Sequence, residues 1–128
     1  MNRIEFILYV KDQDQATAFY KAVLACEPTL NVPGMTEFEL RDRVVLGLMP
    51  ASGIRRLLGD AIQDPDLADQ IPRAELYLSV DSAQAWVDRA LAAGGKLLSP
   101  VSLKNWGDCV GYVADLDGHV LAFAQSPP

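Results

Sequence analysis

The stretch "IEFILYVKD" (residues 4–12) has a near copy, "AELYLSVD" (residues 74–81), later in the chain. Each places a glutamate, Glu5 or Glu75, three residues before a leucine that begins a Leu-x-Val sequence. The surrounding apolar residues predict strands with two largely apolar faces. A carboxylate at the same place in two apolar strands indicates that the chain contains two related modules.

The elements that follow each strand also repeat in order. After the first strand, "QATAFYKAVLA" predicts a helix capped by Asp12 or Asp14, "NVPG" a turn, and "MTEFELRD" and "RVVLGLMP" two strands. After the second, "AQAWVDRALAAGG" predicts a helix capped by Asp81 or Ser82. "KLLSPVSL" then predicts a short strand interrupted by Pro100, and "CVGYVAD" and "HVLAFAQ" two more strands joined by "DLDG". Modules this short cannot bury a face alone, so we expect them to pair.

The length of 128 residues predicts a single domain with one core. We divide residues 1–128 into module one (1–50), a linker (51–73) and module two (74–128). The linker is rich in polar and turn residues, and we expect it to hold a short helix and to lie over the surface.

Charge and composition exclude several classes of partner. The net charge of −6 argues against nucleic acid, whose binding needs a basic surface. No apolar run approaches the roughly 20 residues that span a bilayer, and the start lacks a signal cleavage site, so we expect a cytoplasmic protein with no membrane partner. Cys26 and Cys109 have no metal-like or redox-like spacing, and free thiols are expected.

Two segments carry a family resemblance: "LYVKDQDQATAFYKAVLA" (residues 8–25) and "WGDCVGYVADLDGHVLAFAQ" (residues 106–125). They resemble the opening and closing segments of glyoxalase/bleomycin-resistance/dioxygenase proteins, the vicinal oxygen chelate superfamily. The resemblance covers nearly the whole chain. It implies an α+β fold of two paired βαβββ modules, each sheet curving round a cup, and a homodimer with pockets partly across the subunit contact.

The same resemblance implies where a metal would bind. Metal-using members carry ligands on the first and last strand of each module, and these positions fall on Glu5 and Gly47 and on Glu75 and Ala122. Gly47 and Ala122 have no donor side chain, and a divalent ion needs several N or O donors. The single histidine, His119, lies three residues before Ala122, on the opposite strand face, and we expect it to be a polar residue of the turn or strand edge. We therefore expect no metal and no cofactor.

Two interpretations of the glutamates stay open. Each could begin a strand near solvent and pair with Arg3 or Arg73, or each could face a cup and hold a ligand by a hydrogen bond or by attraction of a cationic group. Strand alternation and the loop tryptophan then predict the ligand-binding set: Glu5, Ile7, Tyr9, Gly47, Met49, Glu75, Tyr77, Trp106 and Ala122.

No catalytic residue is assigned, because the sequence contains no phosphate-binding loop and no nucleophile elbow. Three functions are compatible with these observations. The first is metal-independent binding of a small organic ligand, of a toxic or antibiotic-like kind, in a cup at a dimer interface. The alternative is a lyase, isomerase or dioxygenase-like enzyme that uses Glu5 and Glu75 with a weakly held divalent metal or as acid and base. The third is a fold kept only for oligomeric interaction.

Overall fold

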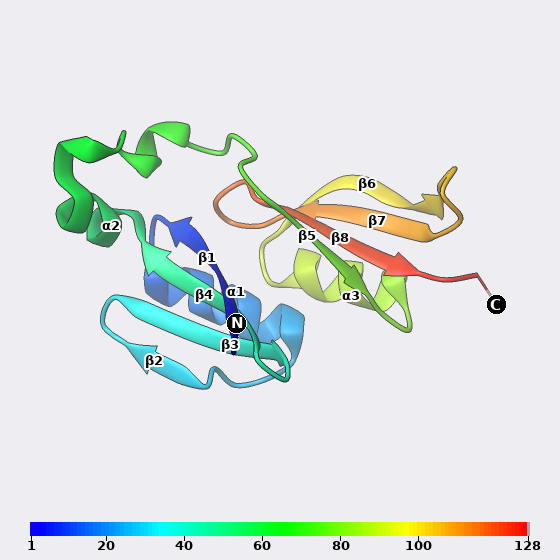
Figure 1. The fold of residues 1–128 in the computed structure, drawn as a ribbon. Helices are drawn as coiled ribbons and strands as arrows, with labels where there is room; N and C mark the ends of the chain where they lie inside the picture. Colours follow the sequence, from blue (N-terminus) through cyan, green and yellow to red (C-terminus); the bar gives the residue numbers. More distant parts are fainter. Residues whose placement is uncertain (128) are drawn as a thin grey trace. The chain divides into compact units, whose positions relative to one another are not determined.

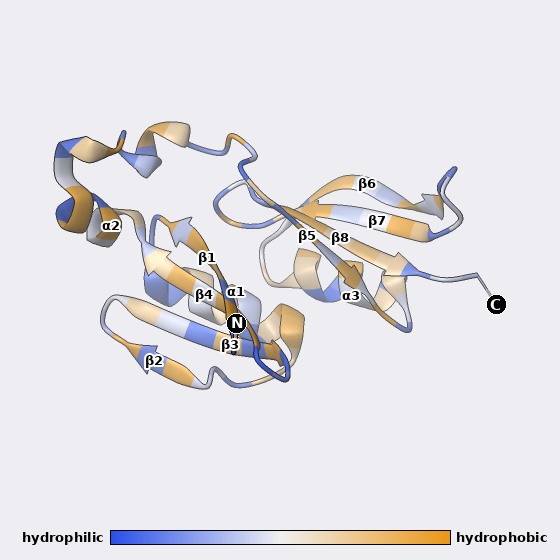
Figure 2. Ribbon diagram, in the orientation of Figure 1, coloured by the Kyte–Doolittle hydropathy of each residue, from blue (hydrophilic) through white to orange (hydrophobic). Residues whose placement is uncertain are grey.

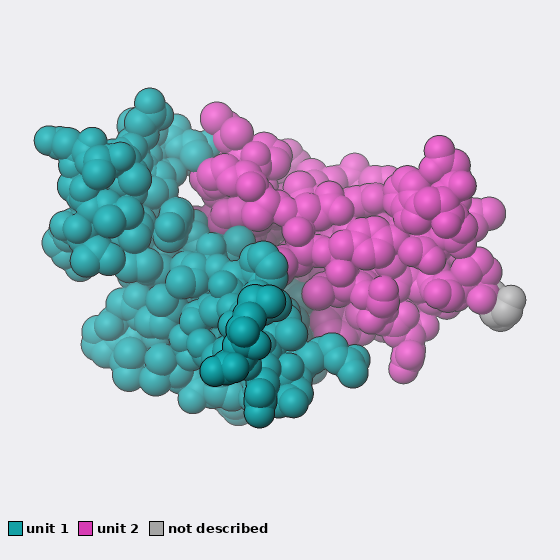
Figure 3. Space-filling model, in the orientation of Figure 1, with its two compact units in different colours: residues 1–69 teal, residues 70–128 magenta. Residues whose placement is uncertain are grey.

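The computed structural model describes residues 1–127 of the chain. It divides into two compact units, Met1–Asp69 (unit 1) and Gln70–Pro128 (unit 2), shown in teal and magenta in Figure 3. The boundary falls inside the predicted linker. The single-domain organisation stays a prediction.

Unit 1 contains one four-stranded sheet and two helices (Figure 1). Its elements are β1 (Ile4–Val10), α1 (Gln13–Leu24), β2 (Leu30–Val32), β3 (Met35–Arg41), β4 (Val44–Pro50) and α2 (Ala51–Leu58), followed by short 3-10 turns at Gly59–Ala61 and Pro65–Ala68. The strand order is β1-β4-β3-β2, with β1 parallel to β4.

Unit 2 repeats this arrangement. Its elements are β5 (Glu75–Ser79), α3 (Ala83–Ala92), β6 (Lys96–Leu103), β7 (Cys109–Ala114) and β8 (Val120–Gln125). The strand order is β5-β8-β7-β6, with β5 parallel to β8. The predicted α+β fold of two βαβββ modules is confirmed.

The helix starts follow from local capping. The Asp12 carboxylate accepts a hydrogen bond from the Gln15 amide at 2.9 Å, and the Ser82 hydroxyl accepts one from the Ala85 amide at 3.3 Å. These bonds satisfy backbone donors that have no partner within the first helical turn. Of the predicted alternatives, Asp12 and Ser82 are therefore the caps.

The core of unit 1 lies between α1 and one face of its sheet. Phe19 and Tyr20 of α1 and Phe38, Leu46 and Leu48 of the sheet are all buried. Burying one such side chain contributes about 1.5–3 kcal/mol. Residues that alternate with this apolar set lie on the other face, and Figure 2 shows the hydrophilic ones on β3 as blue bands. We call the sheet face opposite α1, and the corresponding face opposite α3 in unit 2, the helix-free face.

The core of unit 2 lies between α3 and its sheet in the same way. Leu121 and Phe123 of β8 are fully buried, and the Trp86 ring of α3 lies 5.7 Å from the Phe123 ring. A Cβ at Gly111 of β7 would lie 2.7 Å from the Val87 side chain of α3, so this glycine permits close packing of helix on sheet.

Three local features differ from or refine the sequence predictions. Strand β2 was not predicted, because three residues before a Pro-Gly turn carry too little periodicity. Pro100 does not interrupt β6; it lies on an edge strand with an irregular register, where a missing N–H is tolerated. The linker holds α2, as expected, and among residues 1–127 no helix has the length and apolar character of a membrane span.

Candidate functional site

Glu5 lies on the helix-free face of unit 1, above Gly47. In the parallel pairing of β1 with β4, Gly47 is the partner of Ile7, and a side chain built on it would collide with Glu5 Oε2. The Glu5 side chain is only 16% exposed, and its Oε2 atom is buried with no hydrogen-bond partner. Glu5 therefore occupies the space that a residue larger than glycine would need.

Arg3 holds this carboxyl group and also binds Glu37. Arg3 donates from Nη1 to Glu5 Oε1 at 3.2 Å and from Nη2 to Glu37 Oε1 at 2.9 Å. Burial raises the pKa of Glu5, and the hydrogen bond and charge of Glu37 raise it further, while Arg3 acts in the opposite direction. The predicted pairing with Arg3 is thus present, together with a partner, Glu37, that was not predicted.

The other unit 1 candidates lie nearby on the same face. Ile7 and Tyr9 follow Glu5 by strand alternation and are 41% and 39% exposed. Met49 is partly buried and extends towards Gly53 at the start of α2. The structure thus groups Glu5, Ile7 and Gly47 closely and sets Met49 against α2.

Glu75 does not repeat the environment of Glu5. It is exposed at the start of β5. Of the two open interpretations, the one that pairs Glu75 with Arg73 is not observed, because Arg73 donates to the Asp117 carbonyl at 2.7 Å and contacts His119 Nε2 at 3.2 Å. The short turn before β8 competes successfully for this guanidinium because it offers two acceptors.

Tyr77 and Trp106, both predicted, are joined by a hydrogen bond. Trp106 Nε1 donates to the Tyr77 hydroxyl at 2.9 Å, and that hydroxyl donates to Asp108 Oδ2 at 2.5 Å. The bond to Asp108 is the main cause that raises the pKa of Tyr77. The loop after β6 contains a tight turn in which Gly107 has a φ of 101°, and the Trp106 side chain of this loop reaches Tyr77 of β5.

Small residues and a second tyrosine form the face beneath this loop. Ala122 and Ala124 of β8 and Val110 of β7 are buried, and Tyr112 packs against them. Burial raises the pKa of Tyr112, and the charge of Glu75 adds to the effect. The Lys104 ammonium lies 5.6 Å from the centre of the Tyr112 ring. Ala122 is thus a fully buried floor position between Tyr77 and Tyr112, its partners on the two neighbouring strands.

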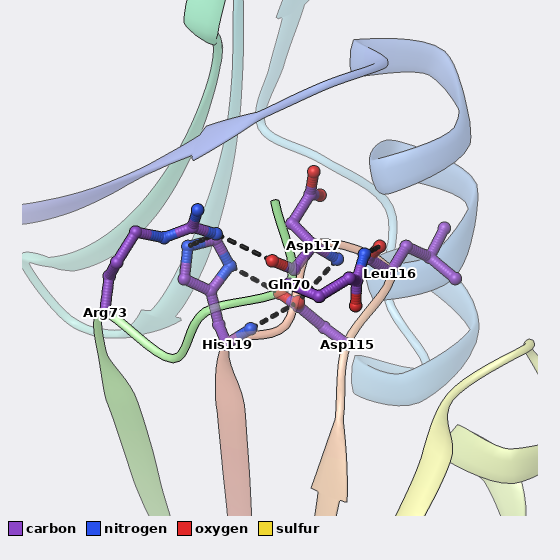
Figure 4. Close-up of polar contacts among 6 residues, drawn as sticks. All are labelled: Gln70, Arg73, Asp115, Leu116, Asp117 and His119. Atoms are coloured by element: carbon purple, nitrogen blue, oxygen red, sulfur yellow. Dashed lines mark hydrogen bonds and ion pairs between the residues drawn. The ribbon is translucent and has the colours of Figure 1, made fainter. Parts of the chain in front are cut away.

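His119 belongs to a buried network in the turn before β8 (Figure 4). Asp115 accepts from the His119 ring Nδ1 and from the His119 amide, both at 2.9 Å. Because a guanidinium can only donate, His119 Nε2 accepts from Arg73, and the ring proton lies on Nδ1. His119 is 3% exposed. It is a turn residue, as predicted, but a buried one that fixes the turn.

The residues present do not form a metal site of the expected kind. Gly47 and Ala122 provide no donor atom, and Glu5 is engaged by Arg3 and Glu37. Within residues 1–127, no three His, Cys, Asp or Glu side chains converge as metal ligands would.

Sequence reasoning missed three residues that touch the candidates: Glu37, Asp108 and Tyr112. Glu37 and Tyr112 are equivalent, since each pairs with the last-strand position of its unit, Gly47 or Ala122. A register prediction for the last two strands of each module would have found both. Asp108 lies two residues after Trp106 in the same loop, so the sequence "WGD" (residues 106–108) could have indicated it.

Comparisons with known proteins agree with this fold. The model of the Glyoxalase/Bleomycin resistance protein/Dioxygenase superfamily matches residues 1–123. A glyoxalase-related enzyme from Fulvimarina pelagi is 24% identical, with a TM-score of 0.82 over 99% of this chain and 90% of that one. A glyoxalase/bleomycin resistance protein/dioxygenase family enzyme from Burkholderia phytofirmans is 16% identical, with a TM-score of 0.79 over 96% and 97%.

A glyoxalase/bleomycin resistance protein from Catenulispora acidiphila is 19% identical, with a TM-score of 0.69 over 99% of this chain and 100% of that one. No curated protein matches the chain. These structural likenesses concern the fold, whereas the family match spans nearly the whole sequence. The chain belongs to the Glyoxalase/Bleomycin resistance protein/Dioxygenase superfamily.

Proposed function

We propose that the protein binds a small organic ligand without a metal ion, in cups on the helix-free faces of its sheets. The observation that carries the proposal is the Tyr77–Trp106–Asp108 arrangement next to the small floor residue Ala122. Aromatic side chains beside a small-residue floor suit a flat or bulky apolar molecule, and the polar tips orient it. Toxic or antibiotic-like molecules are the ligands we expect.

The proposal includes metal independence, a homodimer with shared pockets, and a cytoplasmic location. Gly47 and Ala122 support metal independence, because neither side chain has the N or O donor atom that a metal site would need at these positions. The two unpaired thiols, Cys26 and Cys109, support a reducing compartment. Metal analysis of protein purified without chelator should find far less than one divalent ion per chain, and light scattering should find a dimer at micromolar concentration.

Ligand-observed NMR with a library of flat aromatic compounds tests the binding. Trp106→Ala should lower the affinity for the best-binding compound by about tenfold, because it removes an aromatic contact. The matched control is Phe6→Ala, since Phe6 is similarly exposed (60%, against 55% for Trp106) but lies outside the predicted set. Equal affinity of the wild type and Trp106→Ala would contradict the proposed cup.

A second candidate function is supported by one observation, the raised pKa of Glu5. General acids and bases are effective when their pKa approaches the working pH, and burial in a site is the usual cause. An enzyme of the lyase or isomerase type would use Glu5, with Glu75, for proton transfer. Turnover of a bound compound that is lost in Glu5→Gln, while binding remains, would favour this candidate over simple binding.

A further inference from the structure

The side-chain hydrogen-bond donors around Tyr77 are all used inside one small cluster. Trp106 Nε1 donates to the Tyr77 hydroxyl at 2.9 Å, and that hydroxyl donates to Asp108 Oδ2 at 2.5 Å. An indole has one N–H and a phenol has one O–H, so neither ring holds a second hydrogen. Trp106 and Tyr77 can therefore offer a ligand their ring faces, but they can donate to it only by breaking a bond that already exists.

The polar capacity that remains in this cluster lies mainly on Asp108. Its Oδ2 atom receives the Tyr77 hydroxyl, and among residues 1–127 no hydrogen bond reaches its Oδ1 atom and no cation pairs with it. A carboxylate has two oxygens with about four lone-pair sites and no hydrogen to give. The side chain is only partly buried, so these sites are open to a ligand. They can accept from that ligand and cannot donate to it.

The loop that carries Asp108 is closed by its own backbone. It connects β6 to β7 (Figure 1), and its amides at Lys104 and Gly107 donate to the carbonyls of Asp108 and Lys104, at 2.8 Å and 3.0 Å. These two bonds fix the ends of a short turn, and the Tyr77 hydroxyl ties its acidic side chain to β5. The carboxylate is thus held in place before a ligand arrives, which lowers the entropy cost of binding.

The nearby cation is directed to another part of the face. The Lys104 ammonium donates to Ser102 Oγ at 2.9 Å and lies 5.6 Å from the centre of the Tyr112 ring. Tyr112 and Tyr77 are the partners of Ala122 on either side, so two strand spacings, about 10 Å, separate their backbones. The face therefore has an acceptor end at Tyr77 and a cationic end at Tyr112.

The floor between these ends cannot add polar selectivity. Val110, Ala122 and Ala124 are buried and carry no polar side-chain atom. Trp106 and Tyr77 are 55% and 42% exposed, so a flat ligand can contact both rings. Which polar group such a ligand must carry is then decided at its edge, where it meets Asp108.

We propose that Asp108 is a specificity-determining residue of unit 2, which selects flat aromatic ligands carrying an N–H or O–H donor over ligands of the same shape that carry only an acceptor. The proposal deepens the proposed function and rests on it. A donor group of the ligand would gain a hydrogen bond to a charged acceptor. An acceptor group would lose its water and meet only lone pairs at this end of the face.

Indole and benzofuran are the matched probes for this selectivity. They have nearly the same flat shape, and one has a ring N–H where the other has a ring oxygen. NMR titration of the whole chain measures the two dissociation constants. Indole should bind at least about tenfold more tightly than benzofuran, because hydrogen bonds to charged groups contribute more than neutral ones.

The variant Asp108→Asn tests the residue itself. It keeps the shape of the side chain, removes the charge and adds N–H donors, so the preference for indole should fall to within about twofold. The matched control is Asp88→Asn, the same chemical change at an exposed position of α3, where Asp88 accepts from Gln84 at 2.9 Å. Asp88→Asn should keep the full preference for indole.

A measurement on the wild type needs no variant and still decides if Asp108→Asn disturbs the loop. Carbon-13 NMR of the side-chain carboxyl groups should show that indole shifts the Asp108 signal more than benzofuran does at equal occupancy. The Asp88 signal should stay unchanged with both compounds. Equal shifts of the Asp108 signal by the two compounds would overturn the proposal.

Two further results would overturn the role of Asp108: equal affinities of the wild type for indole and benzofuran, or a full preference for indole in Asp108→Asn. If both compounds bind equally and both lose affinity in Trp106→Ala, the proposed cup stands and only the selectivity fails. If neither compound binds while other flat aromatic compounds do, the selectivity again fails alone. If no flat aromatic compound binds, the proposed function fails with it.

Discussion

The two units share a topology but differ at equivalent positions. In unit 1, the residues beside the last-strand Gly47 are Glu5 and Glu37, and Arg3 binds both. In unit 2, the corresponding floor residue is Ala122, its β7 partner is Tyr112, and Glu75 stays exposed. Duplicated backbone pairing therefore preserves the places of side chains without preserving their chemistry: one place holds an acid pair, the other an acid near a tyrosine.

The turns before the last strands differ as well. In unit 2, the buried pair of Asp115 and His119 fixes the turn, and the exposed Arg73 contacts His119 from outside. Unit 1 makes the same connection with the two-residue turn Asp42–Arg43, in which Arg43 has a φ of 62°. The equivalent Gly118 has a φ of 91°. Unit 2 thus relies on side-chain hydrogen bonds and a glycine where unit 1 accepts a strained arginine.

The largest expected effect concerns the buried network. Asp115→Ala should lower the free energy of unfolding of the chain by about 3 kcal/mol, because the His119 ring and two backbone amides lose a buried acceptor. Urea unfolding followed by circular dichroism measures this. The exposed Asp42→Ala is the control in unit 1 and should stay within about 0.5 kcal/mol of the wild type. Equal losses in the two variants would remove the contrast between the turns.

The next effect compares the two positive-φ positions. Gly118→Ala should cost at least about 1–2 kcal/mol, because the left-handed conformation disfavours a Cβ. The added atom would also collide with the Gln70 backbone. Arg43→Gly should instead stabilise the chain by up to about 1 kcal/mol by relieving the same strain. Thermal unfolding of both variants measures whether Gly118→Ala lowers and Arg43→Gly raises the stability. A loss of stability in Arg43→Gly would show that the Arg43 side chain compensates for the strain.

The pH dependence of stability should reflect the burial of Glu5 in unit 1. The pKa of Glu5 is raised above its ordinary 4.5, so the folded chain holds a proton that the unfolded chain releases. The stabilisation from Glu5 is complete below pH 4.5 and is lost as the pH rises through the raised pKa. In Glu5→Gln, urea midpoints measured across this range should lose that decline. A decline that persists in Glu5→Gln would show that another group causes it.

The smallest effect concerns the loop of unit 2. The hydrogen bond to Asp108 raises the pKa of Tyr77, so Asp108→Asn should lower the pKa of Tyr77 towards 10.0 and leave stability within about 1 kcal/mol. Absorbance titration of the tyrosinate, with Tyr77→Phe to identify the signal, measures this. An unchanged titration in Asp108→Asn would show that the bond does not persist in solution.

The fold was predictable because its signals are local and repeated. A few residues of local sequence are enough to predict each of several elements. These elements are the strands that carry Glu5 and Glu75, the helix caps Asp12 and Ser82, and the turn at Gly118. β2 was not predicted because it depends on pairing with β3 rather than on its own three residues.

The candidate site was only partly predictable. Tyr77 and Trp106 were singled out separately, but their hydrogen bond depends on how the turn at Gly107 closes. Glu37 was missed because its contact with Glu5 depends on the register of β3 against β4, which includes an irregularity between Glu39 and Arg41. A one-residue change of register would move Glu37 to the other face.

The absence of a side chain at Gly47 constrains how this site can change by mutation. A Cβ at this position requires the carboxyl end of the Glu5 side chain to move, because Glu5 Oε2 now fills the space above Gly47. A histidine or glutamate at position 47 would therefore change two places on this face at once, its own and that of the Glu5 carboxyl group.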